Sequence, residues 1–170
     1  MMIQFILGLV VYSVVPDVDF DRYQGTWYEI ARFPNRFQKK CVGDVTATHS
    51  LRSDGKIDVL NRCRVVDGSF ISARGIAKTV GKSQPNSMLK VRFAPGFLSF
   101  LPMVWGDYHV LTLAPDYSFA AVGSPDRRYL WILARSPAMP ASTYRQILEE
   151  VRAKGFDIER LSLTVPSVAE

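Results

Sequence analysis

Side chains that could support catalysis or metal binding are few in this sequence. Its 170 residues include two histidines, His49 and His109, and two cysteines, Cys41 and Cys63. The histidines are too few and too far apart for a convincing metal site. No serine lies in a nucleophile-elbow context, and no recognisable base stands next to Cys63, although a cysteine thiol can act as a nucleophile. The sequence therefore predicts a protein that is not an enzyme and has no metal or cofactor site.

Composition and charge are those of one globular domain that favours anionic surfaces. Hydrophobic residues make up 48% of the chain and charged residues 22%, which is ordinary for a globular protein. The net charge of +5 attracts anionic partners, either phospholipid or nucleic acid. The basic residues are scattered, however, and do not form a block interleaved with stacking aromatic residues. We therefore expect no nucleic-acid binding.

The beginning of the chain is an apolar segment distinct from the rest. Residues 3–15 are almost wholly apolar, but a membrane-spanning helix needs ~20 such residues. The run fits the apolar region of a secretory signal, although no Lys or Arg precedes it. The alternatives are a mis-assigned start or an N-terminal strand of the fold. We expect residues 1–15 to be a signal or targeting segment and residues 16–170 to form a single domain.

Strand-like alternation is clearest on the two sides of the turn at residues 53–55. On each side, apolar residues occupy every second position, and Gly55 suits a hairpin turn. Pairing Leu51 with Ile57 places both apolar sets on one face, as the interior of a barrel requires. The facing pairs in this register are His49 with Val59, Ala47 with Asn61, and Val45 with Cys63.

Eight strand-like runs with short turns, followed by one helix, define the expected architecture. The apolar stripe of the helix consists of Tyr144, Ile147, Leu148 and Val151. Pro140 suits its first position and Gly155 its end, and residues 161–165 suggest a last short strand. The sequence predicts an all-β fold: an eight-stranded up-and-down antiparallel barrel with one C-terminal α-helix packed on its wall. A barrel of this size can hold one small ligand.

The alternation also predicts which side chains line the barrel. Small residues on the strand from Ala73 to Ala77 leave room for a ligand. The predicted lining is Glu29, Ala47, His49, Val59, Asn61, Ala73, Gly75, Ala77, Leu89, Val91, Tyr108, Val110 and Trp131. Four of these residues, Glu29, His49, Asn61 and Tyr108, have polar groups that could hold a ligand's head group. For Glu29 the alternative is an ion pair or hydrogen bond within the barrel.

An apolar stretch between Gly96 and Gly106 shows no alternation. Such a stretch either folds over a core or is exposed for binding. In a basic protein we expect peripheral contact with a membrane surface, or with a partner, at the barrel mouth. The residues predicted to make this contact are Phe97, Leu98, Phe100 and Leu101.

Three motifs resemble those of the lipocalin family. The run Gly25-Thr26-Trp27-Tyr28-Glu29 resembles the Gly-x-Trp signature that opens the first barrel strand of that family. Asp116-Tyr117 lies where the family has a Thr-Asp-Tyr turn, with Pro115 in place of the Thr. The run from Trp131 to Arg135 resembles the last barrel strand, whose Arg covers the indole of the signature tryptophan. The string from residue 21 to 32 resembles the bacterial lipocalins and apolipoprotein D in particular.

The resemblance implies a fold and a function for residues from about 18 to about 165. It implies a lipocalin barrel that holds a fatty acid or lysophospholipid, for storage, transport or envelope maintenance. It also implies an extracytoplasmic location, in the bacterial periplasm or at the outer membrane. An even pair of cysteines in such a protein suggests a Cys41–Cys63 disulfide. The alternative function is a thiol-dependent lipid-modifying enzyme on the same barrel that uses Cys63.

Overall fold

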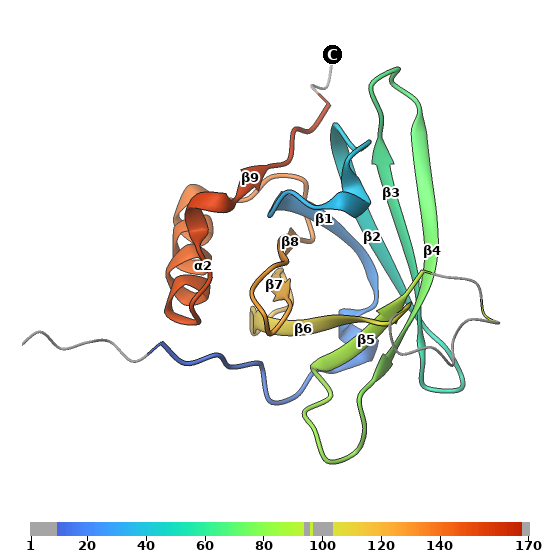
Figure 1. The fold of residues 1–170 in the computed structure, drawn as a ribbon, viewed down its shortest axis with the longest axis vertical. Helices are drawn as coiled ribbons and strands as arrows, with labels where there is room; N and C mark the ends of the chain where they lie inside the picture. Colours follow the sequence, from blue (N-terminus) through green and yellow to red (C-terminus); the bar gives the residue numbers. More distant parts are fainter. Residues whose placement is uncertain (1–9, 94–95, 97–103, 168–170) are drawn as a thin grey trace, which may run out of the picture.

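Eight antiparallel strands follow one another around a closed barrel, with one long helix beside it (Figure 1). The computed structural model describes residues 10–93, 96 and 104–167. β1 pairs with both β2 and β8, which closes the barrel. The strands are β1 (Gly25–Arg32), β2 (Gly43–Leu51), β3 (Ile57–Arg64), β4 (Phe70–Thr79), β5 (Met88–Arg92), β6 (Gly106–Leu113), β7 (Phe119–Gly123) and β8 (Leu130–Ala134). The predicted eight-stranded up-and-down barrel is confirmed.

Shorter elements flank the barrel strands. α1 (Phe20–Tyr23) precedes β1, and η1 (Arg36–Gln38) lies in the connection between β1 and β2. α2 (Ala141–Ala153), η4 (Ile158–Arg160) and β9 (Ser162–Leu163) follow the barrel. β9 pairs with the end of β1, so the expected last strand is present but is shorter than residues 161–165.

The two ends of the barrel differ in what borders them. We call one end the mouth; it carries the connections 33–42, 65–69, 93–105 and 124–129. The other end, the floor, carries the connections 52–56, 80–87 and 114–118. α1 lies at the floor, where Phe20 and Tyr23 pack against residues of the barrel interior. The floor is therefore closed by the segment that leads into β1, whereas loops surround the mouth.

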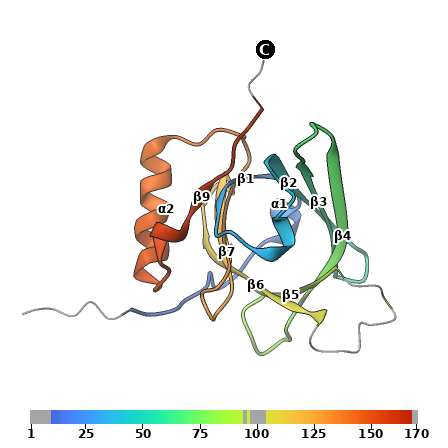
Figure 2. The ribbon, with the colours of Figure 1, turned by 45° about the horizontal axis from the view of Figure 1, so that its top comes forward.

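Two apolar cores share the barrel wall. The inner core lies inside the barrel and includes Trp27 and Leu89. The outer core lies between the wall and α2, where Ile147 and Val151 are fully buried, and α2 runs alongside the barrel (Figure 2). The apolar stripe of α2 is thus a packing face against the barrel wall. The helix begins one residue later than expected because Pro140 is its N-cap rather than its first residue.

The predicted register of β2 and β3 holds over most of the hairpin. Leu51 pairs with Ile57, His49 with Val59, and Ala47 with Asn61. The expected pair of Val45 with Cys63 is wrong, because the register shifts between Gly43 and Thr46. Within this irregularity Asp44 has a φ of 46°, and such a bulge adds a residue that alternation does not anticipate.

β4 is longer than the strand that follows it. It pairs with β3 from Phe70 to Ala77. In the part of the chain that the structure describes, β5 pairs only with the last four residues of β4, Ile76 to Thr79. The first five residues of β4 are exposed. Within the described part of the chain, this end of β4 therefore has a hydrogen-bonded strand on one side only.

The chain from residue 10 to 14 packs along the outside of the barrel, and Val15 and Val18 then pack against the inner core. The hydroxyl of Tyr12 lies 2.8 Å from Nδ1 of His109, and Nζ of Lys154 donates to the carbonyl oxygen of Ser13 at 3.1 Å. The backbone N–H of Val15 donates to the carbonyl oxygen of Val110 at 3.0 Å. Most of the apolar segment 1–15 precedes these contacts and lies outside the described residues, as do Phe97, Leu98, Phe100 and Leu101. Among the described residues, no helix is long and apolar enough to cross a membrane.

Candidate functional site

The predicted lining occupies the inner wall, because paired residues on neighbouring strands share a face. Val59, Ala77, Leu89 and Val110 are buried in the inner core. Three further predicted residues, Val91, Tyr108 and Trp131, are partly buried against that core. Toward the mouth, one row of pairs joins Trp27, Ala47, Asn61 and Ala73. Along this row exposure increases, and Ala73 is exposed.

The room expected beside Gly75 is taken by a neighbouring side chain. Gly75 pairs with Val59 and faces inward. A Cβ atom on Gly75 would lie 2.7 Å from Cδ1 of Phe93 and 2.7 Å from the carbonyl oxygen of Arg92. The aromatic ring of Phe93 therefore covers this glycine, and Phe93 belongs to the lining although the predicted list omits it. The small residues Ala47 and Ala73 are the ones that widen the wall near the mouth.

A cluster of aromatic side chains forms the floor of the interior. The ring centroid of His49 lies 5.4 Å from that of Tyr23 and 6.0 Å from that of Tyr108. The hydroxyl groups of Tyr23 and Tyr108 are 2.7 Å apart. His49 is only 4% exposed, and its Nδ1 has no hydrogen-bond partner among the described residues. Burial, and secondarily the positive charge of Arg135, lowers the pKa of His49 to about 4, so the imidazole is neutral at pH 7.

Arg135 seals the floor from outside. Its Cζ lies 3.8 Å from the centroid of the Trp27 ring, as the lipocalin resemblance implies. Its guanidinium donates to the carbonyl oxygens of Arg22 at 2.7 Å and Tyr23 at 3.1 Å. The indole Nε1 of Trp27 donates to the same Tyr23 carbonyl at 2.8 Å. Tyr117, from the turn that resembles the family motif, accepts the backbone N–H of Asp19 at its hydroxyl. These contacts join the lead-in of β1 to the end of β8.

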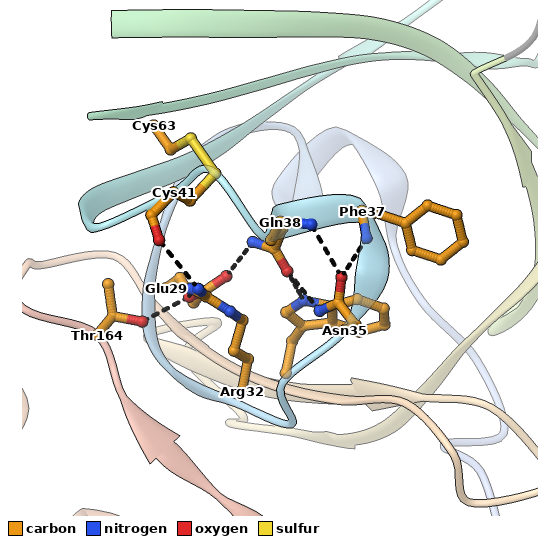
Figure 3. Close-up of a disulfide and its surroundings, with 9 residues drawn as sticks. Glu29, Arg32, Asn35, Phe37, Gln38, Cys41, Cys63 and Thr164 are labelled. Atoms are coloured by element: carbon orange, nitrogen blue, oxygen red, sulfur yellow. Dashed lines mark hydrogen bonds and ion pairs between the residues drawn. A yellow bond between two sulfur atoms is a disulfide. The ribbon is translucent and has the colours of Figure 1, made fainter. Parts of the chain in front are cut away.

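A buried carboxylate organises the mouth of the barrel (Figure 3). Glu29, 7% exposed, accepts from Arg32 at 2.5 Å, from the hydroxyl of Thr164 at 2.5 Å and from Nε2 of Gln38 at 2.7 Å. The side-chain oxygen of Gln38 in turn accepts from Nε1 of Trp131 at 2.9 Å. Protein donors therefore already bind the Glu29 carboxylate. This arrangement is the alternative considered from the sequence, an ion pair and hydrogen bonds within the barrel.

The loop between β1 and β2 is fixed to the barrel at two points. Gln38, in η1, binds Glu29 and Trp131 as described. Cys41 is joined to Cys63 on β3 by a disulfide, with their Cα atoms 5.5 Å apart. Cys63 is 4% exposed. It therefore offers no free thiol in this state, which removes the support for a thiol-dependent enzyme.

Arg32 reaches Glu29 because β1 contains a bulge. Glu29 pairs with Leu133, but Ala31 pairs with Ile132, so the register shifts at the residue between them. Strict alternation along β1 predicts that Ala31 shares the inner face with Trp27 and Glu29. This prediction is wrong, because Ala31 packs in the outer core. After the bulge, Arg32 pairs with Trp131 on the inner face. The sequence did not predict the contacts of Arg32 and Gln38 with Glu29. No residue pattern indicates the bulge in β1 or the direction in which the loop after β1 folds.

The four polar groups proposed for a head group do not form one site. His49 and Tyr108 lie together at the floor. Glu29 lies at the mouth and is already bound by three donors. Asn61 stands on the wall between Ala47 and Ala73. In the described part of the chain, no cluster of His, Cys, Asp or Glu could hold a metal ion.

Two hollows lie on the outer wall rather than in the interior. One, of about 80 Å³, opens between β1, β2 and the C-terminal segment around Tyr28 and Thr164. The larger, of about 390 Å³, opens over β1 to β3, with threonine side chains and the guanidinium of Arg62 at its edge. Polar side chains share its lining with Leu60 and Phe70, so it is not the enclosed apolar cavity that an acyl chain needs.

A family comparison decides what this barrel is. Residues 18–166 match the family model described as a lipocalin-like domain. The chain belongs to the lipocalin family. This lipocalin is 43% identical over 156 residues to temperature-induced lipocalin-1 of Arabidopsis thaliana, covering 91% of this chain and 83% of that protein. It is 39% identical over 149 residues to outer membrane lipoprotein Blc of Escherichia coli strain K12, covering 87% and 79%.

Animal proteins are also similar to this lipocalin. Apolipoprotein D of Mus musculus is 32% identical over 160 residues, covering 89% of this chain and 78% of that one. The solved structure of insecticyanin from the tobacco hornworm Manduca sexta superimposes with a TM-score of 0.70 at 20% identity, covering 91% and 84%. At that identity the likeness shows the fold alone. The resemblance to bacterial lipocalins and apolipoprotein D is thus confirmed.

Proposed function

We propose that this lipocalin holds a fatty acid or lysophospholipid inside its barrel, for storage, transport or envelope maintenance. The observation that carries the proposal is the inner wall, which is apolar or small from Ala73 at the mouth to Val110 near the floor. An acyl chain buried along such a wall gains ~0.8 kcal/mol per CH₂ group. Lipocalins are in general binding proteins, and small lipophilic ligands suit a lining of this kind.

The polarity of the interior sets the direction of the ligand. At the floor, His49 is neutral and the guanidinium of Arg135 is bound to backbone carbonyls outside the aromatic cluster. A carboxylate or phosphate buried there would lose its hydration without gaining a cation. At the mouth, Arg32 faces the interior beside Trp131, and Asn61 stands on the wall. The acyl chain therefore points to the floor and the head group stays at the mouth.

The setting of the proposed function is extracytoplasmic, in the periplasm or at the outer membrane. A disulfide fits an oxidising compartment, and a related protein is named an outer membrane lipoprotein. The apolar segment 1–15 supplies the targeting signal in this proposal. Because Tyr12 binds His109 on β6 and Ser13 binds Lys154 at the end of α2, a retained segment fits these contacts better than removal after Ser13. Phe97, Leu98, Phe100 and Leu101 then supply peripheral membrane contact.

The test is to fill the interior from one strand. Ala77 is 4% exposed and lies between Ile57 and Val91 on the inner face. Ala77→Trp should abolish binding of a fluorescent fatty acid and of lysophosphatidylcholine, measured by titration. Ile76→Trp is the matched control, because Ile76 immediately precedes Ala77 in the same strand and faces outward. Circular dichroism and urea unfolding show whether each variant is folded.

A second variant keeps the test decisive if Ala77→Trp does not fold. Ala73 lies on the same face nearer the mouth and is exposed. A tryptophan side chain there should therefore clash with fewer neighbouring atoms than one at Ala77. Ala73→Trp should lower lipid affinity by narrowing the entrance. Folded variants at Ala73 and Ala77 that both bind as tightly as the parent would show that the ligand is not inside the barrel.

A further inference from the structure

Exposed apolar side chains gather around the mouth of the barrel. Val66, in the connection between β3 and β4, is 91% exposed, and Phe37, in η1, is 66% exposed. We call the mouth ring the exposed apolar residues of the mouth loops and adjoining strand ends: Phe37, Val42, Val66, Phe70, Ile71 and Phe93. Among the described residues of the floor connections, Val80 is the one exposed large hydrophobic side chain. A one-sided concentration of this kind marks an interaction surface.

Charge is distributed in the same one-sided way. The mouth connections that are described throughout, 33–42, 65–69 and 124–129, hold five Lys or Arg and two Asp. The floor connections 52–56, 80–87, 114–118 and 135–140, together with residues 16–24, hold five Lys or Arg and five Asp. The basic residues of the mouth are Arg36, Lys39, Lys40, Arg127 and Arg128. The mouth connections are therefore positively charged, whereas the floor segments have no net charge.

We propose that the mouth ring docks onto an anionic phospholipid bilayer, with the barrel axis directed at the lipid. Apolar side chains that enter the headgroup boundary combine with Lys and Arg that meet anionic headgroups, and neither contribution is sufficient alone. Aromatic residues such as Phe37 and Phe93 suit this depth because their rings are large and apolar. The floor, which has no net charge to attract anionic headgroups, remains in water.

This docking deepens the proposed function. It rests on that function only for the passage of a lipid between bilayer and barrel. A lipid that enters through the mouth could pass between bilayer and barrel without crossing water. Exposed apolar side chains and basic residues define this surface, and neither depends on what the barrel holds. Every member of the mouth ring lies among the described residues.

Two valines at opposite ends of the barrel allow a matched experiment. The full chain is sedimented with large unilamellar vesicles of phosphatidylcholine that contain phosphatidylglycerol, and with vesicles of phosphatidylcholine alone. The parent should bind the anionic vesicles more tightly, and added salt should weaken binding. Val66→Glu should lower the partition coefficient at least about tenfold, whereas Val80→Glu, the same change at the floor, should lower it less than about twofold.

A change without charge tests the apolar contribution separately. Phe37→Ser should weaken binding to the anionic vesicles several-fold without altering the salt dependence. All three side chains are exposed, so the variants should unfold at the same urea concentration as the parent. Equal losses for Val66→Glu and Val80→Glu would overturn the proposal, because the whole surface rather than the mouth would then be responsible.

Two further measurements separate this proposal from its competitors. Displacement of a fluorescent fatty acid in solution, without vesicles, should be the same for Val66→Glu as for the parent. A parent that binds the fatty acid but not the vesicles would overturn docking and leave the proposed function standing. If light scattering without vesicles finds a dimer that Val66→Glu dissociates, the ring is covered by a second copy of the chain and the bilayer is not its partner.

Discussion

Arg135, at the end of β8, lies over the indole ring of Trp27, with Cζ 3.8 Å from the ring centroid. Both side chains also donate to one carbonyl oxygen, that of Tyr23, at 3.1 and 2.8 Å. The contact thus joins the first strand, the last strand and the lead-in helix in a single arrangement. A planar guanidinium can stack and donate at the same time, which an ammonium group cannot do.

We therefore expect Arg135→Lys to destabilise the protein although it keeps the charge. Loss of several hydrogen bonds and of the stacked geometry should lower the free energy of unfolding by about 1–3 kcal/mol. Urea unfolding followed by tryptophan fluorescence measures the change. Arg128→Lys, at an exposed position in a mouth loop, is the control and should have little effect. Equal stabilities of the two variants would show that Arg135 acts only as a charge.

His49 should make the stability of the barrel depend on pH. Its pKa is lowered to about 4 in the folded protein, against an ordinary value of about 6.5. Between these values the unfolded chain takes up a proton that the folded protein does not. Stability is therefore fully present above about pH 6.5 and is lost as the pH falls toward 4, by about 3 kcal/mol in total.

The variant His49→Phe isolates this contribution. Its free energy of unfolding should fall less than that of the parent between pH 7 and pH 4.5, by about 2–3 kcal/mol. Urea titrations of both proteins at the two pH values provide the comparison. Carboxylates with lowered pKa values, such as Asp116, contribute to both proteins and cancel. Parallel losses in the two proteins would mean that His49 is not buried as a neutral group.

Glu29 should hold the mouth loop in place. Glu29→Gln removes the charge that pairs with Arg32, whose side chain is 17% exposed, and leaves the guanidinium without its partner. We expect a loss of about 2–4 kcal/mol and faster trypsin cleavage at the exposed Lys39 and Lys40. Asp58→Asn, which breaks an exposed pair with Arg52, should change neither quantity noticeably. Unchanged cleavage in Glu29→Gln would contradict the role given to the carboxylate.

The disulfide should contribute to stability and to loop order. Cys41 and Cys63 are 22 positions apart, and closing a loop of that size stabilises a protein by about 3 kcal/mol. The double variant Cys41→Ser/Cys63→Ser should show that loss and cleave faster at Lys39 and Lys40. Thiol counting in denaturant should find no free thiol in the extracytoplasmic protein. Two free thiols there would rule out the bond.

The parts of the fold that the sequence predicted are those fixed by regular periodicity. Alternation with a turn at Gly55 gave the pairs from Leu51–Ile57 to Ala47–Asn61 correctly, because a hairpin turn sets the register of the strands beside it. The spacing of Ile147 and Val151 likewise identified the packed face of α2. The lipocalin resemblance added the Arg135–Trp27 contact, which no alternation rule would supply.

The remaining parts depend on irregularities that side-chain patterns do not record. A bulge in β1 moved Ala31 to the outer core and Arg32 to the interior, and a bulge in β2 displaced Val45 from Cys63. The role of Gln38 depends on how a loop folds back over the mouth. The ring of Phe93 over Gly75 also needs the three-dimensional packing of neighbouring strands. For these reasons the lining was foreseen better than the polar contacts that surround it.

The first residues of β4 extend past the end of β5, so the hydrogen-bonded wall of the barrel is interrupted between these two strands. Among the described residues, the backbone groups of Phe70 to Arg74 that face away from β3 have no strand to bond with, so they are available to water or to another extended segment. β5 pairs with β4 at four positions, from Ile76 to Thr79, whereas β3 pairs with it at eight, so β4 is held less firmly on its β5 side. Amide exchange should therefore be faster at Phe70 to Arg74 than at Ile76 and Ala77, which have strand partners on both sides.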